Sequence, residues 1–181
     1  MPARPRAQGA SLKPEPTGNV ELVPVGPRDL ERVRGWLCHP HVSRWWGDPD
    51  QSWSVIGRHP PSQQALISLG GEPVGYVLWQ RPSPKELTAA GLSGLPPDHV
   101  DVDILVGEPE LVGRGVGPKA LLLVVDRLRS LGVSSVGLGT DTTNQPALRA
   151  FEKAGFRLLH EFEEGGRTMC YLTRDLGLPP P

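Results

Sequence analysis

Hydrophobic positions along this chain follow two different periods. Between Pro27 and the segment His39-Pro40-His41, apolar side chains recur every three or four residues, which predicts a helix that opens at the first proline and ends at the second. Shorter runs, several of them alternating apolar with polar residues, predict strands. The predicted strands are 20–25, 64–69, 73–80, 100–106, 133–140, 156–162 and 168–173.

Two later helical stretches and several glycines complete the order of elements. Residues 119–131 and 144–154 have helical spacing, and each stretch is followed by a glycine. Glycine pairs at 70–71 and 165–166 predict hairpin turns. The order is therefore strand, helices, three strands, helix, strand, helix and two strands. It predicts an α/β domain with a mixed sheet that carries helices on both faces.

Composition limits the organisation and the partners of the chain. A length of 181 residues suits a single domain, and we expect a disordered proline-rich tail at 1–19, a folded domain at 20–175 and a flexible tail at 176–181. The net charge of −1 and the lack of a long apolar run argue against nucleic-acid and membrane partners. Cys38 and Cys170 lie far apart without metal spacing, so we expect free thiols, no metal and a cytoplasmic protein.

Three glycines, Gly113, Gly115 and Gly117, separate the strand at 100–106 from the helix at 119–131. Glycine permits a positive φ and a close approach of the backbone to a ligand, and the free N–H groups of a following helix attract an anion. Alone, the pattern is as typical of a tight turn as of a binding site. A dinucleotide-binding turn has another glycine spacing and an earlier place in the sheet, so the pattern disfavours a Rossmann domain.

A second block, Asn-Gln-Pro-Ala-Leu-Arg-Ala-Phe-Glu-Lys-Ala-Gly-Phe, occupies 144–156. The two blocks together resemble the acyl-coenzyme A binding core of the GNAT acetyltransferase superfamily. The resemblance implies the GNAT fold, with a mostly antiparallel sheet splayed at its centre, and acetyl-coenzyme A as cosubstrate. It implies that the glycine turn holds the pyrophosphate, the preceding strand bonds the pantetheine and the later helix flanks the cofactor. The cofactor-binding residues so implied are Leu105, Val106, Val112, Gly113, Arg114, Gly115, Val116, Gly117, Asn144, Ala147, Phe151 and Lys153.

Three further blocks, at 39–47, 71–76 and 103–110, are similar to the aminoglycoside 6′-N-acetyltransferases. This resemblance extends over about residues 20–175. It implies transfer to the 6′-amine of an aminoglycoside, a polycationic small molecule, and a part in antibiotic resistance. Some siderophore-building N-acyltransferases share the first block, so a siderophore precursor or another amine stays open as the acceptor. We expect a monomer or a homodimer.

Asp103 is the predicted catalytic residue. A protonated amine must lose a proton before it attacks a thioester, and a carboxylate near the acetyl carbon takes that proton. The resemblance implies that the matching aspartate lies in the acceptor site beside the acetyl group. Because side chains alternate along a strand, Asp103 shares a face with Asp101 and His99. We therefore expect Asp101 to bind the cationic acceptor as well, and His99 is a second candidate for the base.

Trp45 and Trp46 are the other predicted acceptor-binding residues. Adjacent tryptophans cannot both enter one core, so we expect one to pack inside and the other to lie along a sugar ring or an amine. The connection 81–99 is rich in Pro, Gly and Ser, and loops of this length are often functional. We expect it to complete the acceptor wall.

Phe151 departs from the family pattern, in which many members have a tyrosine that protonates the coenzyme A thiolate. Phenylalanine has no proton to give. Solvent or another hydroxyl, such as that of Tyr171 or Thr142, would supply the proton, or the thiolate would leave unassisted because a thiol pKa is about 8.5. The loss of the tyrosine also leaves open a non-catalytic regulator that binds acetyl-coenzyme A, although Asp103 argues against it.

Overall fold

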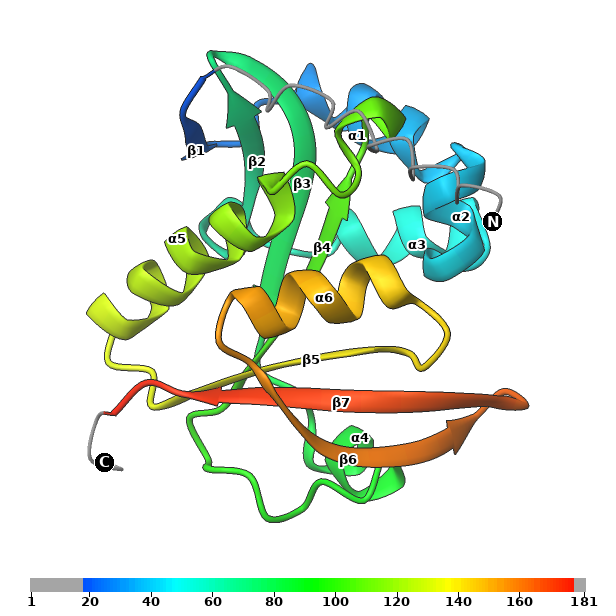
Figure 1. Cartoon of the computed structure of the whole chain (residues 1–181), viewed down its shortest axis with the longest axis vertical. Coiled ribbons are helices and arrows are strands. Elements are labelled where there is room, and N and C mark those ends of the chain that lie inside the picture. Colours follow the sequence, from blue (N-terminus) through cyan, green and yellow to red (C-terminus); the bar gives the residue numbers. More distant parts are fainter. Residues whose placement is uncertain (1–17, 178–181) are drawn as a thin grey trace, which may run out of the picture.

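Seven strands form one mixed sheet in the order β1-β2-β3-β4-β5-β7-β6 (Figure 1). The structure is a computed structural model that describes residues 18–177. Neighbouring strands are antiparallel except for β4 and β5, which confirms the predicted mixed, mostly antiparallel sheet. The strands are β1 (Val20–Val23), β2 (Gln64–Leu69), β3 (Glu72–Gln80), β4 (Val100–Val106), β5 (Ser135–Asp141), β6 (Arg157–Glu164) and β7 (Arg167–Asp175).

Helices lie on both faces of the sheet, as predicted. They are α1 (Asp29–Leu37), α2 (Pro40–Trp46), α3 (Pro49–Ile56), α4 (Pro84–Ala89), α5 (Val116–Ser130) and α6 (Gln145–Lys153), with single 3₁₀ turns at η1 (Pro61–Gln63) and η2 (Pro109–Leu111). The sequence did not predict α2, α3 or α4. Each begins with a proline, which the first turn of a helix tolerates. Asp48 caps α3, and Ser83 forms a capping box with Glu86 in α4.

The long helix α5 begins three residues earlier than predicted, at Val116. Gly115 has φ 82°, a left-handed conformation, and is the last residue before the helix. Val116 is buried in the core, and Gly117 and Pro118 lie in the first helical turn. The N–H groups at the start of this helix are therefore directly adjacent to the glycine turn.

Two hydrophobic clusters occupy the two faces of the sheet. On one face α5 and α6 pack on the sheet, and on the other α1, α2 and α3 do so. Alternation along β4 serves both clusters, because Val102 belongs to the first and Leu105 to the second. In Figure 1, α5 and α6 lie together on the near face.

The folded core extends beyond the predicted boundary at residue 175. Leu176, which the sequence assigned to a flexible tail, is 4% exposed and packs in the first cluster. Its N–H donates to the Ser134 carbonyl at 2.8 Å, and this bond explains why it belongs to the domain. Most of the predicted tails, at 1–17 and 178–181, lies outside the described residues.

The sheet divides between β4 and β5. These strands pair only at Val100 with Val136 and at Asp101 with Gly137. Figure 1 shows the consequence: β2, β3 and β4 lie roughly along one axis, and β5, β7 and β6 cross that axis. The separation begins at Val102, so it frees the whole second half of β4. Within residues 18–177, no helix is long and apolar enough to cross a membrane.

Candidate active site

A cleft of about 710 Å³ opens where β4 and β5 part. Its walls come from α2, the free edge of β4, the glycine turn, the end of β5, α6 and the start of β7. A concave site with many apolar and few polar groups is the usual form of a small-molecule site. Nothing in residues 18–177 groups three or more His, Cys, Asp or Glu side chains in a way that would hold a metal ion.

The free edge of β4 presents backbone groups to this cleft. Gly107 N–H donates to the Val74 carbonyl of β3 at 2.8 Å, and the hydrogen bonds of an antiparallel pair alternate along the strand. The backbone groups of Ile104 and Val106 therefore point away from β3, and those of Leu105 point toward it. Leu105 also buries its side chain among α1 to α3. Both predicted residues line the cleft, as does Ile104; the backbone N–H and carbonyl groups of Val106 and Ile104 point toward it, whereas those of Leu105 point toward β3.

Two histidines of the 39–47 block attach α2 to the end of β4. His41 Nε2 donates to the Val106 carbonyl at 3.0 Å, and His39 Nδ1 donates to the Gly107 carbonyl at 3.0 Å. The Val106 carbonyl therefore already accepts a hydrogen bond from His41. The Val106 N–H points toward the cleft, where it can donate to a ligand. These two hydrogen bonds join the block at 39–47 to the block at 103–110.

A third contact supports the same wall. Trp36 Nε1 donates to Glu108 Oε1 at 3.0 Å. A Cβ atom at Gly107 would overlap the indole ring of Trp36, so only glycine fits between β4 and α1. Glu108, which the sequence singled out with its 103–110 block, thus holds a helix in place.

The glycine turn lies at one end of the cleft. Gly113 and Gly115 have φ of 75° and 82°, and both line the cleft together with Gly117 and Val112. Val116 faces the core and Arg114 is outside the cleft lining. Their side chains are therefore not cleft-lining groups, whereas the prediction for these two residues concerns their backbone amides and stays a prediction. The backbone here is open, because a Cβ at either left-handed glycine would meet nothing within 4 Å.

Helix α6 forms an adjacent wall. Asn144, Ala147, Phe151 and Lys153 all line the cleft, as does Arg149, which the sequence did not single out. Asn144 is a helix cap: its Oδ1 accepts from Ala147 N–H at 3.3 Å and it is 7% exposed. Phe151 is 5% exposed and is an apolar part of the wall. The wall thus combines apolar surface with two cations.

Asp103 lines the cleft from the face of β4 that carries α1 to α3. The carboxylate is open to the cleft, but the surrounding walls remove part of its hydration. This loss, together with the negative charge of Asp101, raises its pKa to about 6. A carboxylate with this pKa is mostly ionised at pH 7 and is a suitable proton acceptor.

Asp101 and His99 do not reach the cleft lining. The Tyr171 hydroxyl donates to Asp101, and His99 Nε2 lies 2.7 Å from the same hydroxyl. His99 Nδ1 lies 2.8 Å from Ser135 Oγ, and the ring is 2% exposed. The three residues predicted to share a face do so, but only Asp103 opens to the cleft. Alternation could not show this, because Tyr171 is about 70 residues away in the chain.

Both tryptophans line the cleft, and they divide as expected. Trp46 packs against the α1–α3 cluster. The ring of Trp45 contacts two guanidinium groups, with Cζ of Arg44 4.7 Å and Cζ of Arg167 5.9 Å from its centroid. Arg44 lay in a block quoted for its resemblance, whereas no sequence signal marked Arg167, which reaches this ring only through the folding of β7.

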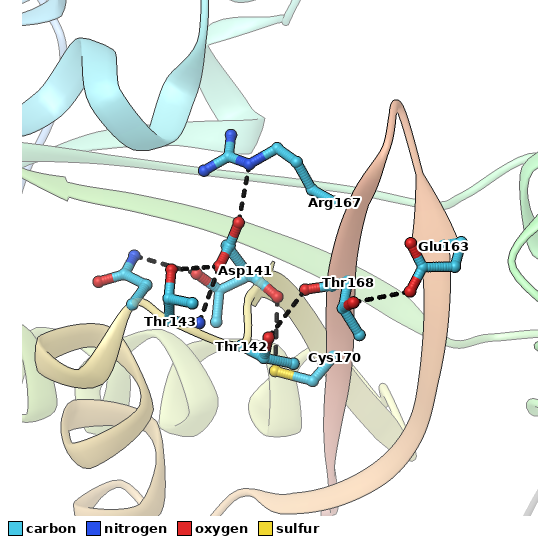
Figure 2. Close-up of polar contacts among 9 residues, drawn as sticks. Asp141, Thr142, Thr143, Glu163, Arg167, Thr168 and Cys170 are labelled. Atoms are coloured by element: carbon cyan, nitrogen blue, oxygen red, sulfur yellow. Dashed lines mark hydrogen bonds and ion pairs between the residues drawn. The ribbon is translucent and has the colours of Figure 1, made fainter.

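Neither hydroxyl predicted as a proton donor to the thiolate lines the cleft. Tyr171 is engaged by Asp101, and the loss of hydration on burial, reinforced by the charge of Asp101, raises its pKa well above the usual range. Thr142 Oγ1 donates to the Thr168 carbonyl at 3.1 Å, as Figure 2 shows. The threonine hydroxyls that do line the cleft belong to Thr140 and Thr143.

The connection 81–99 contributes no cleft-lining residue, in contrast to the prediction. It contains α4 and lies beside β6, where Gly91 approaches the ring of His160. In Figure 1, α4 is next to β6 at the far end of the sheet from β1. The wall of the cleft that carries Trp45 and Trp46 is formed by α2, and the start of β7 lies beside it.

Comparison with known proteins agrees with this geometry. The family model described as an acetyltransferase (GNAT) domain matches residues 26–164, well over half of the chain. A mycothiol acetyltransferase from Acidothermus cellulolyticus is 31% identical over an alignment of 152 residues, and the match covers 74% of this chain and 42% of that protein. The chain thus spans about two fifths of the length of this curated relative.

Solved structures show the same fold. The aminoglycoside acetyltransferase AAC(6')-Ib, in complex with coenzyme A and kanamycin, has a TM-score of 0.67 at 22% identity over 87% of this chain and 95% of that one. An aminoglycoside N(6')-acetyltransferase from Legionella pneumophila has a TM-score of 0.69 at 16% identity over 88% and 94%. With the match of the family model, these findings establish that the chain belongs to the GNAT acetyltransferases.

Proposed function

We propose that the chain is an N-acetyltransferase that moves the acetyl group of acetyl-coenzyme A to a primary amine. One observation carries the proposal: the parting of β4 from β5 brings the glycine turn, a free strand edge and Asp103 into a single cleft. Anion-binding amides, hydrogen-bond donors for a carbonyl and a proton acceptor are the groups that acetyl transfer to an amine requires.

The cleft residues suit this cosubstrate. Backbone amides at 113–117 would hold the pyrophosphate, since they stand at the N-terminus of the 15-residue helix α5. Arg149 and Lys153 are further cations for phosphate, and Phe151 offers apolar surface. When bound, acetyl-coenzyme A would supply the activated acetyl group.

The residues of the chain then have separate tasks. The N–H groups of Ile104 and Val106, on the free edge of β4, are placed to donate to the acetyl carbonyl and to the pantetheine amides. Asp103 takes the proton from the acceptor ammonium, so that the amine nitrogen bonds to the carbonyl carbon. The carbon–sulfur bond breaks, the nitrogen releases its second proton to solvent, and the thiolate takes a proton from solvent, because the Phe151 side chain has none to give.

The acceptor is the finer part of the proposal. The sequence resemblance makes the 6′-amine of an aminoglycoside the first acceptor to test. A second candidate is another primary amine with fewer positive charges. A specific observation favours it, because Asp101 is engaged by Tyr171 and the cleft exposes Arg44 and Arg167 near the acceptor wall.

Release of coenzyme A thiol tests the proposal. Kanamycin, a kanamycin analogue with a 6′-hydroxyl and a panel of simple amines would be compared with wild-type protein and Asp103→Asn. We expect turnover with at least one primary amine and a loss of roughly 10²- to 10⁴-fold in the variant. Asp126→Asn, an exposed change on α5, is the matched control and keeps full activity.

The outcomes separate the alternatives. Turnover with kanamycin but not with its 6′-hydroxyl analogue supports the aminoglycoside acceptor. Unchanged activity in Asp103→Asn removes this residue from the reaction. Tight acetyl-coenzyme A binding without turnover on any amine contradicts the enzyme and supports a regulator.

A further inference from the structure

Two arginines around Trp45 form a positively charged group at the acceptor wall. Arg44, on α2, is exposed, and Arg167, at the start of β7, comes from a different wall of the cleft. Both guanidinium groups contact the same indole ring, at 4.7 Å and 5.9 Å from its centroid. Two cations thus contact one ring, and both residues line the same cleft.

The orientation of Arg167 is determined by a second contact. Its Nε donates to Asp141 Oδ2 at 2.7 Å, and Asp141 is itself held by the N–H of Thr143 at 2.7 Å and by its hydroxyl. In Figure 2 the terminal nitrogens of the guanidinium point away from Asp141. Within residues 18–177 these nitrogens have no hydrogen-bond partner. The fork of donors that suits a carboxylate is therefore held in place and unused.

The charges around Trp45 do not cancel. Asp141 is ionised, since the hydrogen bonds from Thr143 and the nearby Arg167 guanidinium hold its pKa below the usual range. In the described part of the chain Arg44 has no ion pair, and the carboxylate that pairs with Arg167 also accepts hydrogen bonds from Thr143. An anionic group entering the cleft would balance the remaining positive charge.

We propose that the acceptor is an amino acid-like molecule whose carboxylate binds Arg44 and Arg167 while its amine reaches Asp103. This inference rests on the proposed acetyltransferase function and names the class of its acceptor. The carboxylate would accept hydrogen bonds from the terminal nitrogens of Arg167 and pair with Arg44. A polycationic acceptor would instead bring its other ammonium groups near two guanidinium groups, and like charges repel.

The coenzyme phosphates are the competing occupants of these arginines. The glycine turn of α5, with Arg149 and Lys153 of α6, already offers a separate set of anion-binding groups in the cleft. The two assignments differ in a measurable way. Arginines that bind the acceptor change its KM and its selectivity, whereas arginines that bind phosphate change the KM of acetyl-coenzyme A.

Matched pairs of acceptors test the inference. The probes are ω-amino acids of increasing length, each with its carboxamide, and the readout is kcat/KM from thiol release. We expect wild-type protein to prefer the acid by roughly 10- to 100-fold at the best length, as one charge-assisted bidentate contact would give. Arg44→Gln and Arg167→Gln should each reduce this preference about tenfold and leave the KM of acetyl-coenzyme A unchanged. Arg58→Gln, exposed and outside the cleft, should preserve the preference.

Each result decides one question. A preference for carboxamides or for kanamycin over the acids, with turnover intact, overturns the carboxylate site and leaves the acetyltransferase standing. A raised KM for acetyl-coenzyme A in both arginine variants, with the acid preference kept, assigns the arginines to phosphate and also overturns it. No turnover on the whole panel, kanamycin included, overturns the proposed function and with it this inference.

Discussion

At the scale of residues, Asp103 joins the chemistry of the site to the stability of the fold. The loss of hydration in the cleft and the charge of Asp101 raise the pKa of its carboxyl to about 6. An unfolded chain would titrate the same group near pH 3.9. Between these values the folded state binds more proton than the unfolded state, so this residue makes the protein less stable as pH rises.

We therefore expect Asp103→Asn to stabilise the protein at neutral pH while it removes activity. The amide cannot ionise, so the variant should gain on the order of 1 kcal/mol in free energy of unfolding at pH 7.5, because water in the cleft screens part of the penalty. The gain should decline as pH falls from about 6 to 4. Urea unfolding of both proteins across this range measures the difference. A variant that is less stable at pH 7.5 would show that the carboxylate makes a favourable contact in the folded state.

Tyr171 shows why residue chemistry depends on neighbours. Sequence reasoning considered it as an acid for the thiolate, yet the hydroxyl belongs to a buried set with His99 and Asp101. Asp101 was likewise predicted to bind the acceptor, because the sequence does not show that it lies beside Tyr171 in the fold. Asp103, two residues along the same strand, faces no such partner and opens to the cleft.

At the scale of elements, the wall of the cleft depends on how α1 and α2 attach to the end of β4. The His39 and His41 rings bond to the Gly107 and Val106 carbonyls, and the indole of Trp36 covers Gly107. Because Trp36 is 3% exposed and hydrogen-bonded to Glu108, the ring has no space to move.

Gly107→Ala should therefore destabilise the protein by roughly 1–3 kcal/mol or more, the usual range for overpacking. Gly35→Ala, in α1 directly before Trp36, is the matched control. Its Cβ would meet nothing within 4 Å, and alanine in a helix should stabilise by about 0.4–1 kcal/mol. Thermal or urea unfolding compares the two variants. Equal stabilities would contradict the tight fit at residue 107.

The predicted elements were most accurate where the periodic pattern was long. Strands β2 and β4 have the predicted bounds, and the helix over 119–131 appears as α5. The short helix α2 was missed because Pro40, which starts it, was expected to end the preceding helix, and α4 was missed because its segment was expected to form a loop; α3 was not predicted.

At the scale of the whole molecule, two parts of the sheet meet at a narrow join. Only two residue pairs connect β4 to β5, and the bond from Tyr171 to Asp101 adds to them. The cleft lies between these parts and is lined by both. A ligand in the cleft would contact both sides of the join, and a ligand that binds only the folded state stabilises it.

Coenzyme A should raise the Tm by several degrees, as about 2.7 kcal/mol at a concentration a hundredfold above its Kd implies. Gly115→Ala should weaken this shift, because φ of 82° strains an alanine at the anion-binding turn. Gly132→Ala is matched to it, with the same φ and the same open space at the other end of α5. Both variants should lower the Tm without ligand, but only the first should lose the ligand-induced shift. Equal shifts would place coenzyme A away from the turn.

The sequence by itself determined the features that depend on neighbours in the chain. Hydrophobic period determines strand and helix, so the fold class was predictable, and the resemblance of two blocks to a known family marked the turn at 113–117 as the proposed cofactor site. The tertiary structure alone decided which side chains meet across the cleft. Arg167 joins Arg44 at the ring of Trp45, and Tyr171 engages Asp101, although Arg167 and Tyr171 lie far in sequence from the residues that they contact. Such contacts depend on how strands and helices pack, and no local pattern encodes them; for that reason the proposed acceptor class is argued from the folded cleft.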